Sequence, residues 1–376
     1  MKTVRRLLYR DIAGSVLFIA LAFLALFFFI DAVEELSAGA RRGVTPGAAA
    51  LLALLEAPGN LYELAPISML IGTIYALSRM AQASEFTILR TAGLGPGIAL
   101  RLLLLPGAVF GALTFAWGEW VVPQAERAST ELNARLRGAA AIGSGQGAWL
   151  KDSTGSSPQA RSSAVHVSSS SLDGKLQGVR IFEFDVDSRL VRRIEAGGAI
   201  VGRDGIWQLD QARLTDWPAA PVSGANSAGP LAVKQTEASG MAWRSSLTPD
   251  VVNAAVRPVG TMSTLDLWRY SRHLASQEQA AQRYEIRFWK RVLYPLSCVV
   301  MAALALPFAY LHARAGGISL KVFGGIMLGI SFVLVNHLSG HLGLLRDWTP
   351  WVAAAVPSFV YLMLSLAAFA WLVRFR

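Results

Sequence analysis

The chain has a single cysteine, Cys298, among its 376 residues. One thiol excludes an intramolecular disulfide and a thiolate-lined metal site, and because Cys298 lies within an apolar run, we expect it to be buried and inert. Charged residues are also scarce, at 16% of the chain, whereas hydrophobic residues make up 53%. This composition excludes an ordinary soluble protein and predicts a membrane protein.

Common enzyme motifs are missing as well. No G-x-x-x-x-G-K-[S/T] occurs, and the GLGPG stretch at 93–97 lacks the lysine and the hydroxyl of a P-loop, so this chain does not bind ATP in that way. No G-x-S-x-G is present. His337 and His341 have the i, i+4 spacing of two metal ligands on a helix, but no third ligand accompanies them. We therefore expect interfacial hydrogen bonding there, with no metal and no cofactor bound by this chain.

A formal net charge of +10 raises the question of nucleic acid as a partner. The lysines and arginines, however, lie mostly beside apolar stretches and do not form one run. Membrane lipid with anionic headgroups therefore fits the charge better than nucleic acid.

Six apolar stretches are long enough to cross a bilayer. They cover residues 12–30, 61–77, 98–122, 289–311, 322–342 and 350–373. The first could instead be a cleaved secretory signal, but its apolar run is longer than the ~7–15 residues usual in such signals. We expect it to be retained as a transmembrane helix.

The section between residues 124 and 265 has no apolar run of that length. Short runs of alternating character lie at 164–167, 179–186, 190–194, 206–209 and 241–243, with Asp-Gly pairs and a Gly/Ser/Pro-rich stretch between them. This pattern is typical of antiparallel strands. The predicted fold class is a membrane α-helical protein with six transmembrane helices (3+3) and an inserted antiparallel β-jellyroll or sandwich. Its domains would be 1–123 (helices 1–3), 124–265 (β domain) and 266–376 (connecting helix and helices 4–6).

Basic residues in the short loops predict the orientation. With a cytoplasmic N-terminus most of them lie on the inner side, and long translocated domains are exempt from this count. Both termini would then be cytoplasmic, and residues 124–265 would lie outside the cytoplasm. Basic residues at both edges of this section would lie just outside the membrane, where they either snorkel at the interface or attract an anionic amphiphile. They are Arg127, Arg135 and Arg137 before the section and Arg283, Arg287, Lys290 and Arg291 after it. Glu63, near the second span, either lines a polar path or lies at the interface.

A short polar stretch between the second and third spans predicts a helix of about two turns. Ser84 is suited to cap it, Glu85 lies in its first turn and Arg90 in its last, so that both charges complement the helix dipole. One face of this helix is apolar and is formed by Phe86, Leu89 and Gly93. So short a helix needs a partner surface, which is either the membrane interface or another protein.

The order of these parts, together with several short strings, resembles the YjgP/YjgQ permease family of lipopolysaccharide exporters. The strings are AQASE at 81–85 with AG at 92–93, GEWV at 118–121 with PQ at 123–124, QG at 146–147 with WLKD at 149–152, and Trp243 with LTPD at 247–250. The six-span layout extends the likeness over the whole chain.

This resemblance implies a non-enzymatic subunit of the bacterial inner membrane that extracts lipopolysaccharide from the outer leaflet and passes it to a periplasmic bridge. It implies a heterodimer with the paralogue LptF, a dimer of the ATPase LptB that binds ATP and Mg²⁺, and the single-span protein LptC. In this family the short cytoplasmic helix docks on the ATPase. The role falls here on the helix at 84–92, with Ser84, Glu85, Phe86, Leu89, Arg90 and Gly93.

Contacts to the phosphates of the lipid are implied less directly. Relatives carry a lysine at the outer end of the first span, where this chain has FFFID at 27–31. We therefore expect nearby arginines to contact the phosphates: Arg41, Arg42, Arg127, Arg135 and Arg137.

Two other functions fit part of the pattern. A membrane-bound enzyme that modifies lipid would use His337 or His341 in its chemistry. A scaffold subunit of the macrolide-exporter or division-complex type would have fewer spans around its outer domain.

Overall fold

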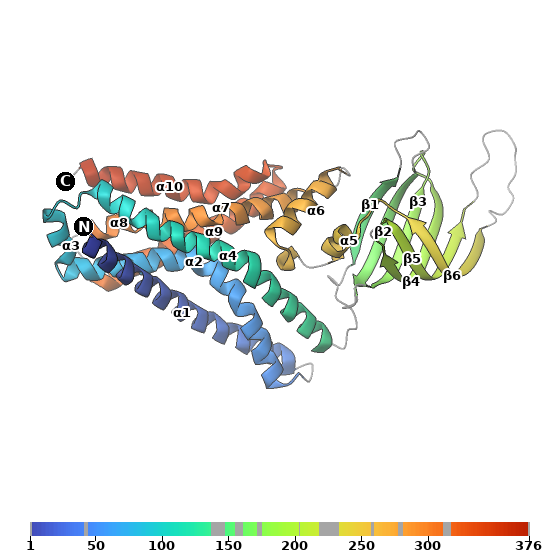
Figure 1. Cartoon of the computed structure of the whole chain (residues 1–376), viewed down its shortest axis with the longest axis horizontal. Helices are drawn as coiled ribbons and strands as arrows, with labels where there is room; N and C mark the ends of the chain where they lie inside the picture. Colours follow the sequence, from blue (N-terminus) through green and yellow to red (C-terminus); the bar gives the residue numbers. More distant parts are fainter. Residues whose placement is uncertain are drawn as a thin grey trace. The chain divides into compact units, whose positions relative to one another are not determined.

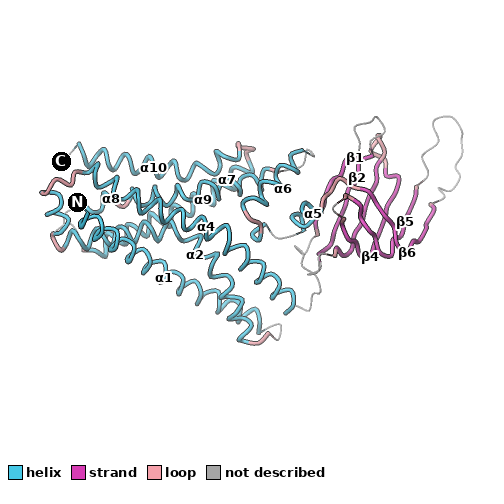
Figure 2. Tube along the Cα trace, in the orientation of Figure 1, coloured by secondary structure: helices cyan, strands magenta, loops and turns pink. Residues whose placement is uncertain are grey.

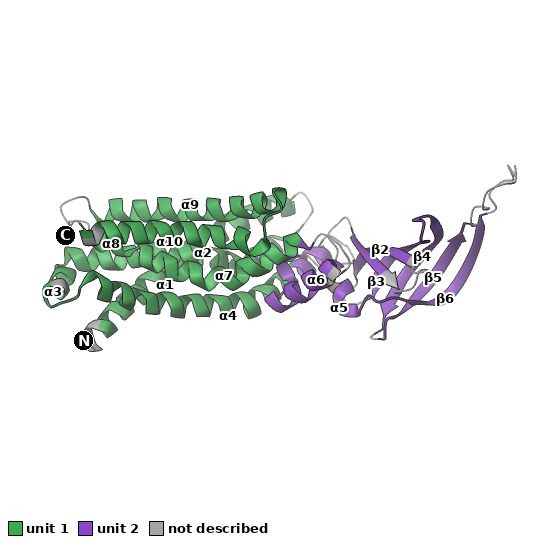
Figure 3. Ribbon diagram, turned by 90° about the horizontal axis from the view of Figure 1, so that it is seen from above, with its two compact units in different colours: residues 1–129, 282–376 green, residues 130–281 purple. Residues whose placement is uncertain are grey.

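The computed structural model describes residues 2–40, 44–136, 147–154, 161–170, 175–202, 204–217, 233–256, 259–276, 281–310 and 317–374. The chain forms two compact units, Met1–Ser129 with Gln282–Arg376, and Thr130–Ala281 (Figure 3). The first division lies inside a helix, because the third long helix continues well beyond its apolar part.

The first unit is entirely helical (Figure 1). Its elements are α1 (Lys2–Ala40), α2 (Pro46–Gln82), α3 (Glu85–Thr91), α4 (Pro96–Leu136, which extends into the second unit), α7 (Gln282–Leu304), α8 (Leu306–Tyr310), α9 (Ile318–Leu345) and α10 (Pro350–Arg374). Among the described residues, six helices are long and apolar enough to cross a membrane, with α7 and α8 forming one of them. The predicted set of six spans is confirmed.

Small residues allow these helices to approach closely. Helix α2 is the most buried span and contacts α1, α7 and α9. A methyl group on Gly72 of α2 would lie 2.5 Å from the Cα of Val16 in α1, and one on Gly111 of α4 would lie 2.7 Å from the carbonyl oxygen of Pro295 in α7. Gly107 and Gly111 form a G-x-x-x-G step, the spacing that lets membrane helices pack backbone to backbone.

The second unit contains one antiparallel sheet of six strands in sequential order (Figure 2). The strands are β1 (Ala148–Thr154), β2 (Arg161–Ser170), β3 (Leu176–Phe184), β4 (Leu190–Val201), β5 (Ile206–Asp216) and β6 (Lys234–Arg244), followed by α5 (Pro249–Val256), a 3₁₀ turn (Val259–Thr261) and α6 (Thr264–Ser276). The inserted antiparallel β domain is thus confirmed; it forms a single sheet whose first strand, β1, was not predicted.

This sheet is bent around its own core. The register of the ladder shifts between Glu183 and Phe184 of β3, as at a β-bulge that bends a strand. Elsewhere one residue on each of β2 to β6 is unpaired without a change of register, at Ser168, Gly178, Gly197, Gln211 and Ser239. Two of these residues, Gly178 and Gln211, have positive φ angles of 61° and 51°. One face carries the buried cluster centred on Trp207 and Ile181, which α5 helps to cover.

Two polar contacts hold the end of this core. The indole Nε1 of Trp243 on β6 donates to Glu183 Oε1 on β3 at 2.9 Å, although the three inter-strand spacings of a flat sheet would separate these strands by about 14 Å. Fully buried Asp152 on β1 accepts hydrogen bonds from Ser245 Oγ at 2.7 Å and from the Ser246 backbone N–H at 3.2 Å. The bend therefore places the motif residues Asp152 and Trp243 in hydrogen bonds that join β1 and β3 to the end of β6.

Candidate functional site

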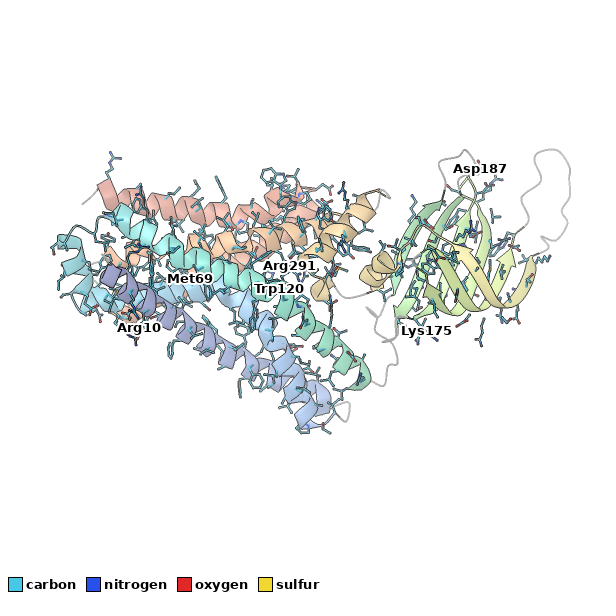
Figure 4. The ribbon with its side chains drawn as sticks, in the orientation of Figure 1. Arg10, Met69, Trp120, Lys175, Asp187 and Arg291 are labelled. Carbon is cyan, nitrogen blue, oxygen red and sulfur yellow. The ribbon has the colours of Figure 1, made fainter. Side chains whose placement is uncertain are left out.

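The first part of α7 presents a row of cations. Arg283, Arg287, Lys290 and Arg291 are separated by four, three and one residues, so they share one face of the helix. Figure 4 labels Arg291 within the helical unit. This row lies in the N-terminal part of α7, before its apolar part.

The four cations line a cavity of about 480 Å³ inside the helical unit. Its other walls come from α1, α2, α4 and α9 and include Glu63, Glu126, Asn336, His337 and His341. Lys290 Nζ donates a hydrogen bond to the carbonyl of Asn336, and Glu126 lies near enough to Arg287 and Arg291 to interact electrostatically. Four cations face two carboxylates among the lining residues, so the cavity has an excess of positive charge when its histidines are neutral.

A joint between α2 and α7 lies at the edge of this cavity. Tyr62 and Tyr294 stack with their ring centroids 4.3 Å apart, and the Tyr294 hydroxyl donates to the backbone carbonyl of Tyr62. In a regular helix that carbonyl would accept from residue 66, but Pro66 has no N–H. The hydroxyl of Tyr294 thus fills the place that the proline leaves open. Gly118 of α4 completes the joint, because a methyl group there would lie 2.3 Å from the Tyr62 ring.

The predicted cytoplasmic helix is present as α3 and begins after a tight turn. Ser84 has a φ angle of 61°, and its carbonyl accepts from the Ile88 N–H at 3.0 Å. At the other end, Gly93 has a φ angle of 98°, a conformation that glycine adopts without steric cost. Two left-handed residues therefore separate α3 from the long helices on either side.

The two faces of α3 differ in their surroundings. Phe86 is only 3% exposed and meets Tyr310 of α8 edge-on, with ring centroids 5.2 Å apart, and Leu89 packs against the same cluster. Glu85 and Ile88 point outward, and Ile88 is 63% exposed. We expected the apolar face of this helix to dock on a partner; for Phe86 this is wrong, because its side chain is covered within the chain. The side chain of Arg90 lies outside the described residues.

Of the arginines expected to meet lipid phosphates, the structure describes Arg127 and Arg135, and neither lines the cavity. Arg41, Arg42 and Arg137 lie outside the described residues. Arg127 is exposed on α4 and is absent from the cavity lining, whereas exposed Arg135 pairs with Glu131 of its own helix at 2.6 Å. The cations of α7, predicted to lie just outside the membrane at the other edge of the β domain, line the cavity. Their spacing along one helix face was the available signal.

His337 and His341 both line the cavity. Within the described part of the chain, no group of three His, Cys, Asp or Glu side chains is arranged to hold a metal ion. The two histidines stand opposite the cations of α7 and can take part in hydrogen bonding to an anion.

Comparison with known proteins bears on the whole chain. The family model described as lipopolysaccharide export system permease LptF/LptG matches residues 6–372. The lipopolysaccharide export system permease protein LptG of Escherichia coli K12 is 26% identical over 341 residues, which cover 90% of this chain and 89% of that protein. The protein of the same name from Haemophilus influenzae is 26% identical over 370 residues, or 97% of each chain.

Proposed function

Since this chain belongs to the family of lipopolysaccharide export permeases LptF/LptG, we propose that it extracts lipopolysaccharide from the outer leaflet of the inner membrane and passes it to a periplasmic bridge. It is an LptG-type permease, a multi-pass subunit of the inner membrane and not an enzyme. The lipid-modifying enzyme considered above is therefore set aside, and the six candidate spans also disfavour a scaffold with fewer spans.

The cationic cavity carries this proposal. Arginine presents paired N–H donors that match a phosphate, and such charge-assisted hydrogen bonds are roughly twice as strong as neutral ones. Within the helical unit Arg287, Lys290 and Arg291 also act at a lower effective dielectric constant than in water. We assign them the binding of phosphate groups of the lipid.

Energy for extraction would come from a partner. The chain has no P-loop, so ATP and Mg²⁺ would be bound by the ATPase LptB. Helix α3 would dock there through its outward face, with Glu85 and Ile88, while Phe86 anchors it to α8. LptF as the second permease subunit and LptC complete the assembly that we propose.

The proposed orientation places α3 in the cytoplasm, together with both termini, and the β domain in the periplasm. The basic residues near the inner ends of the spans support it. The charge row at the start of α7 then faces the outer leaflet, where the lipid would be taken up.

Paired substitutions in the purified complex test the cavity. We expect Arg287→Gln with Arg291→Gln to lower the amount of lipopolysaccharide that co-purifies per complex by about tenfold, the loss that corresponds to one or two charge-assisted hydrogen bonds. Arg135→Gln, outside the cavity, serves as the matched control. Equal lipid retention in both variants would contradict the assignment, and ATP hydrolysis by the permease pair without the ATPase would contradict the division of labour.

A further inference from the structure

The face of the β-sheet opposite to the core carries an aromatic cluster on its first three strands. Trp149 on β1 stands beside His166 on β2, and Phe182 on β3 lies one row away on the same face. The ring centroids of Trp149 and His166 are 4.8 Å apart, and those of Trp149 and Phe182 are 5.8 Å apart. The three rings, which we call the aromatic platform, thus form one contiguous surface.

Trp149 is 60% exposed although it packs on two other rings. The site around it is shaped by Gly147, whose φ angle is 71°. A methyl group at this glycine would lie 2.5 Å from His166 Nε2, so that only glycine leaves room for the imidazole beside the start of β1. The platform is therefore held by backbone geometry as well as by stacking.

Cations border the platform. The Arg193 guanidinium lies 5.8 Å from the centre of the Phe182 ring, the side chain of Arg180 is 55% exposed, and Lys151 is exposed on β1. Glu195 pairs with Arg193 and lies 3.8 Å from Arg180. Three cations beside one carboxylate leave this part of the face positive.

We propose that the aromatic platform binds the anionic sugar part of the exported glycolipid while it passes the β domain. Flat exposed rings bury the apolar C–H face of a sugar, and arginine and lysine bind its phosphate or carboxylate groups. This inference rests on the proposed function for the class of its ligand, but it concerns a different surface from the cavity.

An added strand of a protein partner is the competing occupant of an edge such as β1. Lysine in an exposed edge strand opposes strand pairing, and Lys151 lies in the middle of β1. The charge and the aromatic rings also lie on the face of the sheet, whereas strand addition uses the backbone at the edge. We therefore favour the sugar.

Binding of water-soluble probes to the intact complex in nanodiscs tests the proposal. The probe is the deacylated, phosphorylated oligosaccharide of lipopolysaccharide, compared with its dephosphorylated form and with inorganic phosphate. We expect Trp149→Ala to raise the dissociation constant of the phosphorylated probe by about tenfold and Trp149→Phe to restore most of the affinity. Val186→Ala, at another exposed apolar residue of this domain, should leave it unchanged.

Charge is tested with two matched arginines. Arg193→Gln should weaken binding of the phosphorylated probe severalfold, whereas Arg213→Gln should not, because Arg213 is 58% exposed and pairs with Glu237 away from the rings. Dephosphorylation of the probe should remove the difference, and inorganic phosphate alone should compete only weakly.

Three outcomes would overturn the proposal: no binding of the probe, equal affinity of wild type and Trp149→Ala, or a loss of co-purified partner subunit in Trp149→Ala with unchanged probe binding, which would identify a protein interface. Because the probe has no acyl chains, none of these outcomes bears on lipid retention by the cavity. Failure of the Arg287 and Arg291 test would in turn leave the probe measurements intact.

Discussion

Replacement of Tyr294 by phenylalanine is expected to destabilise the helical unit, because it leaves the Tyr62 carbonyl beside Pro66 of α2 without a hydrogen-bond donor. The substitution keeps the ring that stacks on Tyr62 at 4.3 Å and removes only the hydroxyl that donates to the Tyr62 carbonyl. Because Pro66 has no N–H, this carbonyl then has no donor at the i+4 position.

The size of the effect follows from that single carbonyl. A buried polar group left without a partner costs about 1–3 kcal/mol, and side-chain hydrogen bonds inside membranes average about 0.6 kcal/mol with a maximum near 1.7. We therefore expect Tyr294→Phe to destabilise the helical unit by about 1–2 kcal/mol. In a Pro66→Ala background residue 66 can donate its N–H to Tyr62 within the helix, and the same substitution should then cost about 0.5 kcal/mol or less.

A double-mutant cycle measures this coupling. The four proteins, wild type, Tyr294→Phe, Pro66→Ala and the double variant, would be unfolded reversibly in mixed detergent micelles and followed by far-ultraviolet circular dichroism. The interaction energy should be about 1 kcal/mol and should favour the double variant. An equal cost of Tyr294→Phe in both backgrounds would refute the argument that the hydroxyl replaces the missing backbone donor.

Three further substitutions probe other parts of the chain. Glu85→Lys should lower ATP-driven transport at least about tenfold by opposing a basic partner surface, whereas Glu85→Gln should lower it less; unchanged transport in the reversal would exclude the contact. Gly111→Ala should destabilise the helical unit by about 1–3 kcal/mol in detergent unfolding, because its methyl group meets the backbone of Pro295, while Gly14→Ala, which has open space, should not. Asp152→Ala should lower the free energy of unfolding by about 3 kcal/mol, because the donors of Ser245 and Ser246 lose their acceptor, and it should make residues 130–281 protease-sensitive. Full resistance to protease would contradict the role of these hydrogen bonds.

Hydropathy predicted the parts that depend on long apolar runs. All six spans are found, since the cost of unpaired backbone in the bilayer leaves a long apolar run little choice but a helix. The bounds of α3 lie close to the predicted 84–92, because Glu85 and Gly93 mark its ends locally. Strand β1 was missed because its WLKD segment ends in a buried aspartate, which has a low strand propensity and accepts hydrogen bonds from Ser245 and Ser246, far along the chain.

The surroundings of side chains were less predictable, because they too depend on residues that are distant in the sequence. The apolar face of α3 predicted a partner surface. The local sequence, however, does not show whether that surface belongs to another protein or, as for Phe86, to Tyr310 of the same chain. The spacing of the α7 cations was visible in the sequence, yet their opposition to Glu63, Glu126 and His337 is a product of helix packing. Periodicity predicts which residues share a face of a helix, whereas the residues that contact this face are determined by the tertiary structure.

The inward position of Phe86 changes how docking of α3 would reach the substrate. Phe86 contacts Tyr310, which ends the span Gln282–Tyr310, and the other end of that span carries Arg287 and Arg291. The span consists of α8 and α7, which are divided at Ala305, so a displacement of Phe86 would move α8 first and reach α7 through this turn. The turn residues Ser84 and Gly93, both left-handed, allow α3 to shift without bending α2 or α4. If α3 docks on the ATPase as proposed, closure of that partner would therefore act on the cations of the cavity through α8 and α7, two successive segments of one span.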